Sequence, residues 1–104
     1  MKNFLFLLAL AGLVGGASAK EVVIDVRTPQ EFAQDRIAGA LNIDYTQIAQ
    51  EIGKANVSKD DTVILYCRSG NRSGVALNTL KSMGYSKAVN YGGLEQARRL
   101  LQKP

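Results

Sequence analysis

The sequence predicts an α/β domain with a largely parallel sheet. Segments with helix start and stop signals separate four short apolar runs, so that strands and helices alternate along the chain. At 104 residues, the chain has room for one compact domain and little else. The four runs with the composition of strands are residues 21–26, 40–43, 62–66 and 88–91.

Residues 21–26 (EVVIDV) form a β-branched run that predicts a buried strand. A helix signal follows directly. Thr28 is a good N-cap, Pro29 suits the first helical position, and Glu31 completes a capping box with Thr28. We expect this short helix to end at about Asp35.

Residues 40–43 (ALNI) are the second candidate strand. Asp44 can cap a helix that runs through Ile52. Gly53 then predicts the end of that helix, because glycine readily takes the left-handed conformation that stops a helix.

The run at residues 62–66 (TVILY) predicts the most buried strand, and a loop at 67–73 follows it. A longer helix is expected next, with Gly84 just past its end. A last strand at 88–91, a Gly-Gly turn and a closing helix at 94–102 complete the order. The apolar residues expected near one face of the longer helix are Val75, Ala76, Leu80 and Met83.

The N-terminus reads as a secretory signal peptide over residues 1–19, which leaves residues 20–104 as the folded domain. Lys2 precedes the apolar run at 4–14, and Ala17-Ser18-Ala19 forms an A-x-A site for cleavage after Ala19. The alternative is an uncleaved anchor, but the run is shorter than the roughly 20 apolar residues that span a bilayer. We therefore expect an exported protein without stable membrane association after cleavage.

The composition limits the chemistry. The net charge is +4, and no basic stripe interleaved with aromatic residues suggests nucleic-acid binding. The chain has one cysteine, so no internal disulfide can form. It also has no histidine, which argues against a Cys-His site and against a histidine metal site. An unpaired thiol in an exported chain is a reactive group or an intermolecular pairing site, unless it is simply buried in the core.

Local sequence favours a reactive thiol. Cys67 directly follows the most buried strand, and its loop leads into a helix. In parallel sheets, ligands bind just beyond the carboxyl ends of the strands, which is the position of this loop. Backbone N–H groups of residues 68–73 can curl around the sulfur and bind an anion. The same groups stabilise a thiolate over a thiol, and Gly70 supplies the backbone freedom that a tight loop needs.

The loop side chains are the candidate substrate-binding groups. Arg68 is expected to face the entrance and attract an anionic donor, whereas Arg72 can hold a bound oxyanion or brace the loop. Ser69 and Ser73 offer hydroxyl groups, and Ser73 can also cap the next helix. Asn71, a common turn former, completes the set with Gly70.

Three motifs resemble the signatures of the rhodanese family: C-R-S-G-N-R-S at 67–73, I-D-V-R-T-P-Q-E-F at 24–32 and R-I-A-G-A-L-N-I at 36–43. The likeness extends to Y-G-G-L at 91–94. With the signal peptide, the chain looks most like the single-domain periplasmic thiosulfate sulfurtransferases of the phage-shock type. The resemblance implies a single rhodanese-like domain with a parallel sheet of about five short strands and helices on both faces.

The chain departs from the family pattern at two positions. Arg36 and Ala38 stand where histidine and proline are common in the second signature. These are framework positions, so the departure does not put the activity in doubt. The family's Asp-x-Arg is intact as Asp25 and Arg27. We interpret this pair as scaffold at the strand end, and direct contact with a ligand is the alternative.

The resemblance implies sulfur transfer without a cofactor or metal. Cys67 would take the outer sulfur of thiosulfate as a persulfide and pass it to cyanide or a thiol. One alternative is a cysteine phosphatase, whose loop has five residues between cysteine and arginine, whereas four separate Cys67 from Arg72 here. Another is a non-catalytic sulfur carrier or redox-sensing domain.

Overall fold

A computed structural model describes residues 19–102 as an α/β domain, so the predicted signal peptide, residues 1–19, lies almost entirely outside the described residues. Its four strands are parallel and lie in the order β2-β1-β3-β4. In this part of the chain, no helix is long and apolar enough to cross a membrane. The strands are β1 (Glu21–Asp25), β2 (Leu41–Asn42), β3 (Thr62–Cys67) and β4 (Ala88–Gly93).

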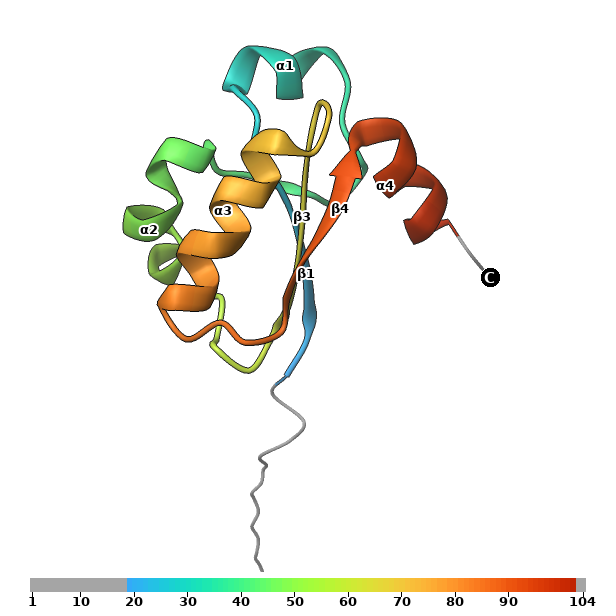
Figure 1. Cartoon of the computed structure of the whole chain (residues 1–104). Coiled ribbons are helices and arrows are strands. Elements are labelled where there is room, and N and C mark those ends of the chain that lie inside the picture. The colour runs from blue at the N-terminus through green and yellow to red at the C-terminus, as the bar shows by residue number, and fades with distance from the viewer. Residues whose placement is uncertain (1–18, 103–104) are drawn as a thin grey trace, which may run out of the picture.

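Helices cover both faces of the sheet and its carboxyl end (Figure 1). Helices α2 (Ile48–Glu51) and α3 (Asn71–Ser82) lie on one face, and α4 (Leu94–Leu101) lies on the other. Helix α1 (Pro29–Gln34) sits above the carboxyl ends of the strands, beside the start of α3. This arrangement confirms the predicted fold class, and it places α1 over the loop that follows β3.

The sheet has four strands among residues 19–102, where the family resemblance implied about five. The remaining chain in this range forms helices and turns, and only four runs carry the β-branched or apolar composition that a strand needs. The central strand is β3, which pairs with β1 on one side and β4 on the other. Its residues 63–67 are fully buried, as the composition predicted.

The segment predicted as one helix from Asp44 to Ile52 is broken. It contains a 3₁₀ turn, η2 (Tyr45–Gln47), then α2, then a second 3₁₀ turn, η3 (Gly53–Ala55). The left-handed residue is Asn56, with φ 61°, and not Gly53 as predicted. Asparagine tolerates this conformation better than most residues, so the chain reverses three positions later than expected.

Helix α3 ends as predicted, with Gly84 in a left-handed conformation at φ 100°. Its buried face differs from the prediction, because Val75 is 52% exposed. The buried residues Ser73, Ala76 and Leu80 are three and four positions apart, which is the spacing of one helix face. A serine on this face is unusual, and it lies next to Cys67.

Candidate active site

Cys67 is the last residue of the central strand and is fully buried. The loop after it folds back over the sulfur. Cys67 Sγ accepts hydrogen bonds from the N–H groups of Gly70, at 3.0 Å, and Ser73, at 3.4 Å. The Ser73 hydroxyl lies 3.3 Å from the same sulfur. The structure therefore surrounds Cys67 with donors that suit a negatively charged sulfur.

Two opposing effects act on the pKa of Cys67. Burial raises the pKa of the thiol, because a charged sulfur is poorly solvated in the protein interior. Hydrogen bonds from the Ser73 hydroxyl and from the N–H groups of Ser73, Ser69 and Gly70 lower it, and together they prevail. The pKa of Cys67 is thus lowered from its ordinary value, which favours the nucleophilic thiolate.

The helix begins earlier in the loop than predicted. Gly70, with φ 101°, is the N-cap of α3, and Asn71 is its first residue. Ser73 was predicted as a possible cap, but it lies inside the first turn with its side chain turned to the sulfur. The N–H groups of this turn consequently point at Cys67. The side chains of Ser69 and Asn71 are exposed, and Ser69 reaches the sulfur only through its backbone.

Arg72 braces the loop. Its guanidinium donates to both carboxylate oxygens of Glu31 on α1, at 2.8 and 3.0 Å. This pairing, together with N–H donation from Thr28, lowers the pKa of Glu31 to about 2. The sequence predicted Glu31 as a capping residue, and the capping box with Thr28 is present. The sequence did not indicate that Glu31 also pairs with Arg72, a contact that joins α1 to the start of α3.

Arg68, the residue predicted to face the entrance, is exposed to solvent. Its side chain is 78% exposed, and its guanidinium lies 3.9 Å from the Glu31 carboxylate. It lines a cavity of about 540 Å³ between the loop, α1 and the start of α4. The other lining residues are Arg27, Glu31, Gln34, Asp35, Ser69, Gly93, Leu94, Glu95 and Gln96. Arg68 is the residue of this cavity whose cationic group is most available to an anion arriving from solvent.

Asp25 and Arg27 form a buried pair, and Arg27 also lines this cavity. The guanidinium of Arg27 donates from Nε and Nη2 to the two carboxylate oxygens of Asp25, at 2.7 to 3.1 Å. Asp25 also accepts from the Arg27 N–H at 2.9 Å. Both residues are nearly inaccessible, at 0% and 5% exposure, as expected for scaffold at the end of β1.

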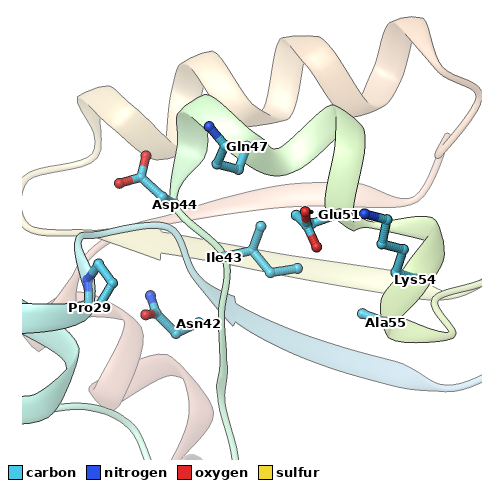
Figure 2. Close-up of a pocket in the computed structure, with 8 residues that line it drawn as sticks. All are labelled: Pro29, Asn42, Ile43, Asp44, Gln47, Glu51, Lys54 and Ala55. Carbon is cyan, nitrogen blue, oxygen red and sulfur yellow. Dashed lines mark ion pairs between the residues drawn. The ribbon is translucent and has the colours of Figure 1, made fainter.

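A second cavity, of about 400 Å³, lies beside the edge strand β2 (Figure 2). It contains neither Cys67 nor an arginine, so it offers no nucleophile and no strong anion-binding group. The Lys54 ammonium is paired with Glu51 at 3.5 Å. The residues that line this second cavity are Pro29, Asn42, Ile43, Asp44, Gln47, Glu51, Lys54 and Ala55.

The two glycines that end β4 let its backbone approach the loop. A Cβ atom at Gly93 would lie 2.5 Å from the carbonyl oxygen of Arg68, which is backbone and cannot rotate away. At Gly70, a Cβ would meet the backbone of Gly92 at 3.5 Å. The loop therefore rests directly on β4.

Gly93→Ala is expected to displace the loop and to lower the rate of Cys67 alkylation at neutral pH, because the N–H donors move off the sulfur. The cost in stability should be on the order of 1–3 kcal/mol, as for other overpacked sites. Alkylation kinetics and thermal unfolding measure the two effects. Gly53→Ala is the control, since a Cβ there meets nothing within 4 Å. Unchanged alkylation in Gly93→Ala would contradict the close approach.

The fold and this site define a recognisable class. The family model for the rhodanese-like domain matches residues 10–99, and the chain belongs to that family.

Relatives named as sulfurtransferases or rhodaneses are among the proteins most similar to this chain. The chain is 42% identical over 77 residues to the thiosulfate sulfurtransferase PspE of Escherichia coli, covering 74% of each protein. A solved structure of an E. coli rhodanese with anions has 41% sequence identity and a TM-score of 0.70, over 73% of this chain and 89% of that one. A human single-domain sulfurtransferase superposes with a TM-score of 0.64 at 28% identity, over 85% and 88%. The predicted class, a rhodanese-type sulfurtransferase, is confirmed.

Proposed function

We propose that this protein transfers the outer sulfur of thiosulfate to a thiophilic acceptor through a persulfide on Cys67. The observation that carries the proposal is the set of donors around Cys67 Sγ, which lowers the pKa of the thiol without any histidine. A thiolate formed in this way needs no general base to attack sulfur. The related protein named as a thiosulfate sulfurtransferase supports the choice of donor.

The proposed reaction has two steps. The Cys67 thiolate attacks the outer sulfur of thiosulfate, the S–S bond of thiosulfate breaks, and sulfite leaves with the electron pair. The new persulfide carries one negative charge on its outer sulfur. Cyanide or a thiolate then attacks that outer sulfur, and the Cys67 thiolate leaves. Both steps conserve charge, and neither needs a metal or a redox cofactor.

The short loop favours sulfur chemistry over phosphate chemistry. Four residues separate Cys67 from Arg72, and the Arg72 guanidinium is already held by both oxygens of Glu31. The loop is thus shorter than the phosphatase loop, and its closing arginine is occupied. Hydrolysis of a generic phosphate ester without sulfur release from thiosulfate would reverse this choice.

The direct test is the mass of the intact protein after treatment with thiosulfate. We expect one added sulfur atom on the wild-type chain, its removal by cyanide, and its absence from Cys67→Ala. Turnover separates an enzyme from a sulfur carrier. An enzyme cycles when cyanide or a thiol is supplied, whereas a carrier loads once and stops. No added sulfur on the wild-type chain would refute the proposal.

Arg68→Ala is expected to raise the KM for thiosulfate by about 3–10-fold and to change kcat less, because an exposed charge acts mainly on encounter with the anion. Steady-state kinetics at low ionic strength measure this effect, and added salt should reduce the difference from wild type. Arg99→Ala is a control with the same charge change at an exposed position of α4. An unchanged dependence on thiosulfate concentration in Arg68→Ala would argue against the entrance role.

We also propose that the protein is exported and acts in the periplasm. The support is the order of a basic residue, an apolar run and an A-x-A site within residues 1–19. N-terminal sequencing of the protein from the periplasmic fraction should start at Lys20. Recovery of the full-length chain in the cytoplasm would contradict this proposal.

A further inference from the structure

The hydroxyl group of Ser73 has three neighbours that compete for its single proton. Ser73 Oγ lies 2.7 Å from Asn90 Oδ1, 3.2 Å from the Gly70 carbonyl oxygen and 3.3 Å from Cys67 Sγ. A hydroxyl group donates only one hydrogen bond. Because Ser73 is fully buried, bulk water does not take the place of these partners. Ser73 therefore cannot donate to Asn90 and to a Cys67 thiolate at the same time.

The side-chain amide of Asn90 has a fixed orientation. Its Nδ2 donates to the Gly70 carbonyl oxygen at 3.1 Å, and its Oδ1 accepts from the Gly92 N–H at 2.8 Å. The reversed amide would place donor against donor and acceptor against acceptor. Asn90 thus presents an oxygen to Ser73, and that oxygen can only accept.

An irregularity in β4 places Asn90 at this point. Leu65 pairs with Asn90, but Cys67 pairs with Gly93, so β4 uses one more residue than β3 between the two pairs. Gly92 takes φ 85° inside this bulge. A bulge at a sheet edge redirects the neighbouring side chains. Here it leaves the Asn90 amide between the loop and the first turn of α3.

We propose that Asn90 is a positioning residue that accepts a hydrogen bond from the Ser73 hydroxyl while the Cys67 sulfur is uncharged, and that this hydroxyl turns to the sulfur whenever it carries negative charge. The proposal rests on the persulfide reaction for its place in catalysis. It extends the site beyond residues 67–73 to a residue on a different strand.

The charge on Cys67 Sγ is lost once and regained once in each cycle. Sγ is a thiolate before it attacks thiosulfate, and it is again a thiolate when the acceptor removes the outer sulfur. Between these events the charge lies on the outer sulfur of the persulfide, and Sγ is bonded and neutral. Ser73 donates to Sγ in the first and last states and to Asn90 Oδ1 in the middle one. No proton leaves the serine, because only its O–H bond rotates.

The charged groups near this cluster are paired with each other or line the adjoining cavity. Arg72 on α3 is paired with Glu31 on α1, and Arg68 and Glu95 line the adjoining cavity from the loop and from α4. The two substitutions that test the proposal, at Ser73 and Asn90, change none of these charges. The Gly70 carbonyl also keeps the Gly74 N–H as a donor at 3.0 Å when the Asn90 amide is removed.

The test is a double-mutant cycle on the pKa of Cys67, measured from the pH dependence of alkylation. Ser73→Ala removes a donor to the thiolate and should raise the pKa by about 1. Asn90→Leu removes the competing acceptor and should lower the pKa by roughly 0.5–1. In the double variant, Asn90→Leu should have no effect beyond that of Ser73→Ala. Asn90→Ala should shift the pKa as Asn90→Leu does, but by less, since water can enter and accept a hydrogen bond from the Ser73 hydroxyl.

The sign of the Asn90→Leu effect decides the outcome. If Asn90 only held the loop in place, its loss would raise the pKa of Cys67, with or without Ser73. A rise or no change in both Asn90 variants would therefore overturn the proposal, as would an equal fall in the Ser73→Ala background. Asn90 is exposed, so both substitutions should leave the fold intact. Alkylation uses no sulfur donor, which keeps this result separate from the test of persulfide formation.

Discussion

Cys67→Ala should reduce sulfur transfer by more than about 1,000-fold, because removal of a covalent nucleophile eliminates the reaction path itself. The substitution should cost only on the order of 1 kcal/mol in stability, since it removes one buried atom from the core. Thiosulfate–cyanide turnover and thermal unfolding measure the two effects.

Cys67→Ser is the matched control for the loop. Its oxygen can still accept from the N–H groups of Gly70 and Ser73, so the loop should keep its structure. The variant should nevertheless be inactive, because a serine hydroxyl has no neighbouring base to activate it in a chain without histidine. Activity near wild type in either variant would refute the mechanism.

Asp25→Ala should destabilise the protein by about 3–5 kcal/mol, because it leaves the buried charge of Arg27 without its partner. The loss is a large part of the roughly 5–15 kcal/mol that stabilises a typical domain. Urea denaturation at neutral pH measures it. The cavity beside the loop should also change, since Arg27 lines it.

Two further variants separate the buried charge from the loss of packing. The double variant Asp25→Leu with Arg27→Met should be more stable than Asp25→Ala, because it removes both charges from the interior. Glu51→Ala breaks the exposed pair with Lys54, where both side chains are at least 43% exposed, and should cost less than about 0.5 kcal/mol. If Asp25→Ala lost as little stability as Glu51→Ala, the buried pair would not stabilise the fold.

Sequence patterns predicted the parts of the fold that depend on neighbours along the chain. The capping box of Thr28 and Glu31 and the end of α3 at Gly84 both depend on residues within one helical turn, and both are present. The broken helix after Asp44 shows the limit. A run of helix-compatible residues does not reveal where 3₁₀ turns will shorten it, because that depends on packing against the sheet.

The features of the site also divide into those set by neighbouring residues in the chain and those set by distant ones. The position of Cys67 at the end of a buried strand follows from the local sequence, and so does the approach of the loop amides to its sulfur. The residues that pair with the loop cannot be read from the local sequence. Glu31 is 41 residues from Arg72 in the chain, and Asn90 is 17 from Ser73. Pairings at such distances come from strand order and from the bulge in β4. The Gly-Gly pair at 92–93 was predicted as a turn after the strand, whereas both glycines lie inside β4 and Gly92 forms part of the bulge.

The dependence of Cys67 on distant partners couples its reactivity to folding. An unfolded chain has a cysteine with an ordinary pKa of about 8.5, so its thiol is mostly protonated and slow to react at neutral pH. Folding brings the donors together and lowers that pKa. By thermodynamic linkage, the folded state gains stability that is fully present above the unfolded pKa and is lost as the pH falls through the folded one.

The donors to Cys67 Sγ come together only when β3 has formed and the first turn of α3 has closed over the sulfur. Completion of the sheet is therefore the event that lowers the pKa of this cysteine.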